Sequence, residues 1–157
     1  TKIFLPHLKT RPEAHIVNIS SVFGIIAVPT QSAYNASKFA VKGFTECLKQ
    51  ELADTSVGVT CVHPGGIKTN IVRNGRMYTD QFGEASDAGK MAAEFEKMAR
   101  TTPEQAAKDI YDAILGKEER VLIGADARVI DLMQRLFPTR YPKIIRFILE
   151  KTEALTK

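Results

Sequence analysis

The chain has 157 residues, of which 44% are hydrophobic and 25% charged, so its composition excludes disordered, collagen-like and low-complexity proteins. No stretch approaches the roughly 20 apolar residues that cross a bilayer, no secretory signal is visible, and a net charge of +4 does not by itself indicate nucleic-acid binding. We therefore expect a cytoplasmic protein without a nucleic-acid partner. Cys47 and Cys61 are expected to be buried free thiols that neither form a disulfide nor bind zinc.

The first predicted strand covers residues 15–20, where β-branched and apolar side chains predominate. It follows a short apolar stretch over residues 3–9 and a polar loop over 10–14. A long helix is expected from near Ser32 to about Leu52, because apolar side chains recur there at steps of three and four residues. The residues that form this apolar pattern are Ala36, Ala40, Phe44, Cys47, Leu48 and Leu52.

A second buried strand is predicted over residues 57–62. It stops at His63-Pro64-Gly65-Gly66, because two glycines and a proline cannot continue a central strand. Residues 67–86 are expected to be irregular and 87–99 helical. A further helix starts at Thr102, a capping residue followed by Pro103, and runs to about Leu115. The remaining elements are a strand over 120–124, a helix over 126–136, a break between Pro138 and Pro142, and a helix from Lys143 to about Ala154.

The order of these elements is strand, helix, strand, helices, strand, helices. Continuously apolar strands separated by helices indicate an α/β fold with a parallel sheet that is covered on both faces. Three strands are few for such a sheet and leave both of its edges unprotected. The chain also begins abruptly with apolar residues after Thr1, as if within a helix. We therefore expect that further strands of the sheet precede Thr1.

Tyr34 and Lys38 lie four residues apart at the start of the long helix, so both are on one helix face. A free tyrosine has a pKa of about 10, and a nearby ammonium group favours its phenolate form. The pair is therefore suited to acid/base work on an alcohol or ketone. Such a pair also arises by chance, and the alternative is an ordinary amphipathic helix with a solvated lysine.

Two further groups of residues lie where buried strands end, at the edge where parallel sheets bind ligands. Ser20 and Ser21 follow the first strand, and a serine hydroxyl there can bond the oxygen that Tyr34 protonates. Residues 63–69 follow the second strand, and a glycine-containing turn lets the backbone approach a flat ligand closely. Ile67 would offer backbone amides and Thr69 a hydroxyl group.

These three motifs resemble, in order and spacing, those of the short-chain dehydrogenase/reductase family over about residues 1–125, with a helical tail over 126–157 outside the shared pattern. The motifs are Asn18-Ile19-Ser20-Ser21, Tyr34-Asn35-Ala36-Ser37-Lys38 and Pro64-Gly65-Gly66-Ile67-Lys68-Thr69. The resemblance implies the C-terminal part of a Rossmann-like doubly wound parallel sheet. It also implies hydride transfer between a nicotinamide cofactor, NAD or NADP, and an alcohol or ketone.

The resemblance assigns a role to each matching residue. In the family the catalytic serine lies thirteen residues before the tyrosine, which selects Ser21 rather than Ser20. Tyr34 would be the general acid/base, Lys38 would lower its pKa and bond the nicotinamide ribose, and Ser21 would hold and polarise the substrate oxygen. The residues that would cradle the nicotinamide are Pro64, Gly65, Ile67 and Thr69. Residues 70–99 match the substrate lid, so Met77, Tyr78 and Phe82 either face the substrate or pack at the surface or in the core.

The family's Gly-rich phosphate-binding turn, its Asn-Ala-Gly segment and its catalytic asparagine have no counterpart in this sequence. We therefore expect the C-terminal half of a longer reductase, in which the missing half selects NAD or NADP, and a chain that does not bind cofactor tightly alone. The alternatives are a non-catalytic nucleotide-binding or scaffold protein on the same fold, and a sugar-nucleotide epimerase or dehydratase.

Two surfaces are candidates for partners. In the resembled family the helix that carries the tyrosine commonly packs against its twin, which implies a homo-oligomer, a dimer or a tetramer. The last helices place basic residues beside an apolar face, which would dock on the protein itself, on another subunit or on a membrane surface. These basic residues are Arg135, Arg140, Lys143, Arg146 and Lys151. No histidine has metal-ligand spacing, so no metal site is expected.

Overall fold

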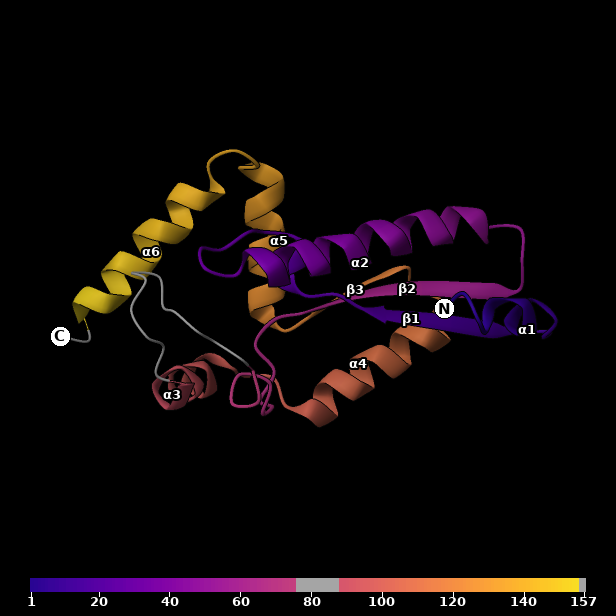
Figure 1. Cartoon of the computed structure of the whole chain (residues 1–157), viewed down its shortest axis with the longest axis horizontal. Coiled ribbons are helices and arrows are strands. Elements are labelled where there is room, and N and C mark those ends of the chain that lie inside the picture. The colour runs from indigo at the N-terminus through magenta and orange to yellow at the C-terminus, as the bar shows by residue number, and fades with distance from the viewer. Residues whose placement is uncertain (76–87, 156–157) are drawn as a thin grey trace.

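Three parallel strands form the sheet of the computed structural model, which describes residues 1–75 and 88–155 (Figure 1). Strands β1 (Ala14–Ile19), β2 (Val57–Pro64) and β3 (Arg120–Ile123) are hydrogen-bonded in the order β1-β2-β3. Because all three run in the same direction, their carboxyl ends meet at one edge of the sheet. The predicted order of strands and helices is confirmed.

Helices α2 and α4 pack on opposite faces of the sheet. Helix α2 (Ser32–Glu51) packs on one face, where the core residues are Ile16, Leu48, Leu52, Val57 and Val59. Helix α4 (Pro103–Leu115) packs on the other face, around Val62, Ala113, Val121 and Ile123. The other helical elements are α1 (Leu5–Lys9), the 3-10 turn η1 (Val22–Gly24), α3 (Ala88–Met98), α5 (Ala125–Leu136) and α6 (Tyr141–Leu155).

The helix starts follow from local chemistry. Thr102 caps α4, accepting a hydrogen bond from the Gln105 amide at 3.2 Å, and Pro103 stands in the first turn, as the sequence predicts. Helix α6 begins at Tyr141, two residues earlier than predicted. Pro142 does not delay it, because the first turn of a helix needs no backbone N–H from that residue.

Helix α2 turns a different face to the sheet from the one that its apolar pattern predicts. Leu48 and Leu52 are buried as expected, but the other four members of the pattern, Ala36, Ala40, Phe44 and Cys47, are exposed. The sheet side instead buries Asn35 and Thr45. Thr45 accepts a hydrogen bond from Asn18 of β1 at 3.0 Å, and satisfied polar groups of this kind can be buried at little cost. The prediction that Cys47 is buried is wrong for the same reason, whereas Cys61 is buried; both thiols are free.

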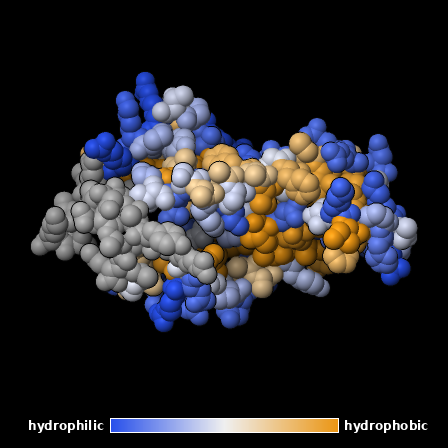
Figure 2. Space-filling view, in the orientation of Figure 1, coloured by the Kyte–Doolittle hydropathy of each residue, from blue (hydrophilic) through white to orange (hydrophobic). Residues whose placement is uncertain are grey.

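The sheet has an open edge at β1, which pairs with β2 alone among the described residues. Ile19, at the end of β1, is 46% exposed. Figure 2 shows apolar side chains exposed along the sheet between α2 and α4. Backbone donors and acceptors on this edge are therefore available to a further strand.

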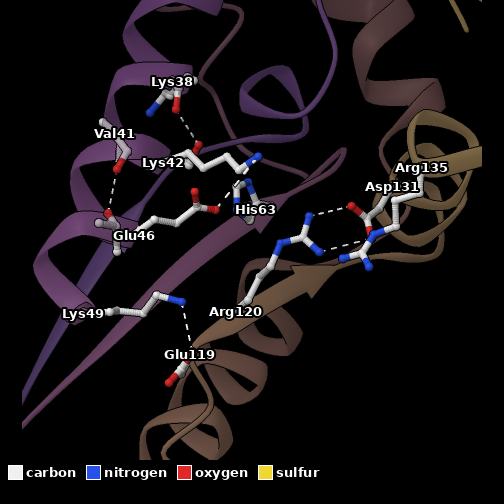
Figure 3. Close-up of polar contacts among 12 residues, drawn as sticks. Lys38, Val41, Lys42, Glu46, Lys49, His63, Glu119, Arg120, Asp131 and Arg135 are labelled. Carbon is white, nitrogen blue, oxygen red and sulfur yellow. Dashed lines mark hydrogen bonds and ion pairs between the residues drawn. The ribbon is translucent and has the colours of Figure 1, made fainter. Parts of the chain in front are cut away.

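An ion-pair cluster fastens α5 to the sheet (Figure 3). The guanidinium of Arg120 in β3 donates two hydrogen bonds to the carboxylate of Asp131, at 3.1 and 2.5 Å. Arg135 Nε lies 2.9 Å from the same carboxylate. The hydrogen bonds from Arg120 lower the pKa of Asp131 below its ordinary value, although burial opposes them. The Asp131 side chain is 10% exposed and that of Arg120 26%, so the pair is largely shielded from water.

We expect Asp131→Ala to lower the free energy of unfolding by about 3 kcal/mol at pH 7, because it leaves a partly buried guanidinium without its carboxylate. A carboxyl group whose pKa is lower in the folded chain stabilises the fold above its unfolded pKa of about 3.9, and this contribution is lost as pH falls through the folded-state pKa. Urea unfolding at pH 7 and pH 3 measures the effect, and the gap between wild type and variant should shrink at pH 3. Asp112→Ala, which breaks an exposed pair with Lys108, should change stability little at either pH. Equal losses in the two variants would contradict the interpretation.

None of the helices in the described ranges is long and apolar enough to cross a membrane.

Candidate active site

The residues singled out by the sequence lie at one edge of the sheet, where β1 and β2 end. Ser20 and Ser21 follow β1 directly, and the turn of residues 64–69 follows β2. Tyr34 and Lys38 lie in the first two turns of α2. Lys38 reaches the end of β1, where its Nζ donates a hydrogen bond to the Ile19 carbonyl at 3.2 Å. Ser21, Tyr34 and Lys38 are thus gathered around one strand end.

Ser21 is held in an extended conformation, with φ −169° and ψ 168°, and is 9% exposed. Its Oγ caps η1 by accepting a hydrogen bond from the Phe23 amide at 3.1 Å. Its carbonyl accepts hydrogen bonds from the Gly24 amide and from His63 Nδ1, each at 3.0 Å. Since the Phe23 contact uses Oγ as an acceptor, the hydroxyl proton stays available for another oxygen.

The Tyr34 ring lies between an aromatic and a cationic neighbour. Its centroid is 6.0 Å from that of Phe23, in an edge-to-face arrangement at 84°. Lys38 Nζ is 5.4 Å from the Tyr34 centroid, within the range of a cation–π contact. Both Tyr34 and Lys38 are half-buried. The Tyr34 ring is therefore held between the Phe23 ring and the ammonium group of Lys38.

Ser20 has a structural task that Ser21 lacks. It is 2% exposed, and its Oγ donates a hydrogen bond to the Lys38 carbonyl at 2.9 Å. Gly24 fits against both partners, since a Cβ there would stand 2.7 Å from the Lys38 carbonyl oxygen and would also collide with Ser20 Oγ. The Ser20 hydroxyl is thus committed to joining η1 and α2. This contact supports the choice of Ser21 as the catalytic serine.

Asn35 is a residue of the site that sequence reasoning treated only as part of a motif. It is 5% exposed, and its amide nitrogen donates to the carbonyls of Phe23 and Ile26 at 2.8 and 2.9 Å. Its amide oxygen accepts from the Val28 amide at 3.3 Å. Asn35 therefore fixes the loop that leads from η1 to α2, beside Tyr34. An asparagine in the first turn of a helix, where it can bond nearby backbone, was the available signal.

The turn after β2 is tied to two other segments. The Gly65 amide donates to the Ile123 carbonyl at 2.9 Å, at the end of β3. The Gly66 amide donates to Asp126 Oδ2 at 2.6 Å, in the first turn of α5. A Cβ on Gly65 would collide with that carboxylate, so the glycine allows the Asp126 side chain to approach the turn closely. Asp126 was missed by sequence reasoning, because it lies 60 residues from its partner.

The second half of the same turn is bridged to the segment before α4. The Lys68 amide donates to the Thr101 carbonyl at 2.9 Å, and Ile67 pairs with Thr101 in a parallel bridge. Thr69 is exposed, and beside it lies a cavity of about 170 Å³ between residues 68–73 and α3. The predicted cofactor residues thus stand on a turn that is held at both ends and open to solvent at Thr69.

Two further predictions concern the substrate lid and metal binding. Met77, Tyr78 and Phe82, predicted in the substrate lid, lie outside the described residues. Among the described residues, no cluster of three or more His, Cys, Asp or Glu could hold a metal ion.

Comparison with known proteins gives consistent matches. The short chain dehydrogenase family model matches residues 1–78. SadH of Mycobacterium tuberculosis is 46% identical over 148 residues, which are 92% of this chain and 52% of SadH. A short-chain dehydrogenase/reductase from Burkholderia phymatum, solved with NAD, has the same fold: its TM-score is 0.71 at 23% identity, over 87% of this chain and 52% of that one.

A short-chain dehydrogenase from Burkholderia cenocepacia J2315, solved with NADP, has a TM-score of 0.65 at 26% identity. The match covers 85% of this chain and 47% of that one. The chain therefore spans about half the length of the proteins compared here.

Proposed function

Because the chain belongs to the short-chain dehydrogenase/reductase family, we propose that it carries the acid/base half of an NAD- or NADP-dependent oxidoreductase acting on alcohols or ketones. The observation that carries the proposal is the arrangement of Tyr34 and Lys38, with Lys38 Nζ 5.4 Å from the centroid of the Tyr34 ring. Ser21, whose Oγ caps η1, lies at the same end of β1. In this proposal the open edge of β1 is where the strands of the cofactor-phosphate half would add.

The chemistry assigned to the chain is the movement of one proton. In ketone reduction, Tyr34 donates its phenolic proton to the carbonyl oxygen, and in alcohol oxidation the phenolate takes that proton back. The Lys38 ammonium stabilises the phenolate that forms. Ser21 donates a hydrogen bond to the same oxygen and so holds it at Tyr34. Fixing donor and acceptor in this way lowers the entropic cost of reaching the transition state.

The donors at this edge fit the nicotinamide end of the cofactor. Lys38 offers an ammonium for ribose hydroxyls, and the exposed Thr69 offers a hydroxyl for the carboxamide. Gly65 keeps the backbone of the turn free of side chain. When bound, the cofactor would supply or accept the hydride, and the protein residues would bind the cofactor and orient it toward the substrate.

Turnover by the intact protein tests this function directly. A panel of alcohols and ketones is offered with NAD and with NADP, in both oxidation states, and nicotinamide absorbance is followed. We expect turnover with one cofactor and a subset of the panel. A protein that binds the cofactor but turns over no alcohol or ketone would support the scaffold alternative instead.

We further propose that the outward face of α2 pairs with the same face of a second copy. This face consists of Ala36, Phe39, Ala40, Gly43, Phe44 and Cys47. Phe39 is 40% and Phe44 52% exposed, and the small residues between them allow close approach of another helix. Apolar residues of this kind, contiguous along a helix, are typical of an interface rather than of a solvated surface.

We expect Phe44→Glu to convert the oligomer into a monomer, because two carboxylates would face each other in an apolar interface. Sedimentation velocity or light scattering measures the change in mass. Tyr111→Glu serves as a matched control, because it places a glutamate at a 61% exposed aromatic position on α4, which packs on the opposite face of the sheet. If both variants keep the wild-type mass, or if wild type is already monomeric at high concentration, this face is not an interface.

A further inference from the structure

His63 is a buried titratable side chain that the proposed chemistry does not use. It lies near the end of β2 and is 0% exposed. Its Nδ1 is 3.0 Å from the carbonyl oxygen of Ser21, and this oxygen can only accept a hydrogen bond. Nδ1 therefore carries the hydrogen, and Nε2 of the neutral ring is left as an acceptor. Nε2 is buried and has no hydrogen-bond partner in the part of the chain that the structure describes.

This arrangement is costly for a residue that merely fills space. A buried acceptor without a partner loses its hydration and gains nothing in return, whereas an apolar side chain of similar size would avoid that loss. What His63 provides in exchange is a single directed contact, the Nδ1–H bond to Ser21. The contact joins β2 to Ser21 itself, the second residue after β1.

We propose that His63 is a positioning residue for Ser21. The inference rests on the proposed function, in which the Ser21 hydroxyl holds the substrate oxygen. Together with the Gly24 amide, His63 fixes the peptide plane that starts η1. That plane places the Phe23 amide, which in turn holds Ser21 Oγ at 3.1 Å. Without the hydrogen bond from His63, the Ser21 carbonyl keeps only the Gly24 amide as a donor, and the Ser21 hydroxyl can shift relative to Tyr34.

The surroundings of His63 keep the ring neutral. Burial lowers its pKa below the ordinary value, and the hydrogen bond to Ser21 opposes that effect in part. The charged groups that act on it are Arg120 from β3, Lys42 from α2 and Asp131 from α5, which are labelled with His63 in Figure 3. A neutral ring with hydrogen on Nδ1 is therefore the form that reaches Ser21 at neutral pH.

The tautomer is tested on the intact wild-type protein without any assay of activity. Selective ¹⁵N labelling of histidine and long-range ¹H–¹⁵N spectra distinguish the Nδ1–H form, the Nε2–H form and the imidazolium. We expect His63 as the Nδ1–H form at pH 7, with His63→Asn used to assign its signals. An Nε2–H form or an imidazolium at pH 7 would overturn the proposal.

Kinetics on three variants test the positioning role. The amide nitrogen of asparagine takes the place of Nδ1, whereas that of glutamine takes the place of Nε2, and leucine provides neither. We expect His63→Asn to keep most of kcat, and His63→Gln and His63→Leu to lose about tenfold to a hundredfold, with KM for the cofactor unchanged. kcat is expressed per folded molecule, measured by circular dichroism.

The outcomes separate the two claims. If His63→Leu, or His63→Gln should that variant alone fold, keeps the wild-type kcat, the positioning role is refuted while the proposed reaction stands. If wild type shows no turnover with either cofactor, the proposed reaction fails and the positioning role fails with it, because the role is defined by that reaction. A loss of kcat in His63→Asn equal to that in His63→Leu would also refute the proposal, because rescue by the correctly placed donor is its signature.

Discussion

Replacing Tyr34 with phenylalanine is expected to lower cofactor-dependent turnover of the intact protein by about a thousandfold or more, with cofactor affinity nearly unchanged. General acid/base catalysis by a positioned side chain is worth about 10² to 10⁴ in rate, and the variant removes the only atom that carries the proton. The aromatic ring remains, so its edge contact with Phe23 and its place beside Lys38 are kept. The folded structure and the nicotinamide site should therefore persist.

The measurement combines steady-state kinetics with a cofactor titration by fluorescence. Tyr111→Phe is the matched control, because Tyr111 lies on α4, is 61% exposed and stands outside the candidate site. It should leave both kcat and cofactor affinity as in wild type. Turnover retained by Tyr34→Phe would refute the acid/base assignment, and loss of cofactor binding in this variant would show that the hydroxyl group is needed for cofactor binding rather than for proton transfer alone.

The second large effect is expected from Gly24→Ala. The new methyl group would stand 2.7 Å from the Lys38 carbonyl oxygen, which belongs to the backbone of α2 and cannot move alone. Either η1 or the start of α2 must shift, and the Ser20–Lys38 hydrogen bond is strained with it. Overpacking of this kind costs about 1–3 kcal/mol of stability. Because Ser21 and Tyr34 lie on the two segments that are forced apart, kcat should fall as well.

Gly43→Ala is the matched control for this substitution. Gly43 lies in the interior of α2, and a Cβ there would meet nothing within 4 Å in this chain. Because Gly43 also belongs to the face that we propose to pair with a second copy, the comparison requires that Gly43→Ala keeps the wild-type mass in sedimentation velocity. Alanine should stabilise the helix by about 0.5–1 kcal/mol, because glycine has the poorer helix propensity. Urea unfolding and kcat are measured for both variants. If Gly24→Ala were as stable and active as Gly43→Ala, close packing between η1 and α2 would not organise the site.

Much of the fold was accessible from local patterns. The strand over residues 57–62 and the helix capped by Thr102 depend on side-chain periodicity and on capping within a few residues, and both elements are confirmed. The predicted end of the strand is wrong, because β2 continues through His63 and Pro64, which pair with β3. The face of α2 was not accessible in this way, because the side that packs on the sheet includes the polar residue Thr45, whereas the more continuously apolar side is exposed. Its pattern of alanines and Phe44 outlines one side, while the sheet selects the other through Asn18 and Thr45.

The candidate site divides along the same line. The spacing of Ser21, Tyr34 and Lys38 and the glycines of the turn are present in the sequence, because their roles are encoded in short motifs. The residues that support them, His63 behind Ser21 and Asp126 beneath Gly66, act across 42 and 60 residues of sequence. No periodicity relates groups so far apart along the chain.

By itself, the sequence determined the order of strands and helices, the family to which the chain belongs and the identity of its proposed acid/base residues, since these depend on residue type and short spacing. Only the tertiary structure decided which serine hydroxyl donates to the backbone within the described residues, which face of α2 is exposed, and what contacts Ser21 and the Pro64–Thr69 turn. The physical reason is that burial and hydrogen bonding depend on neighbours that the folded sheet brings together, and the same side chain is structural or reactive according to which neighbours it meets.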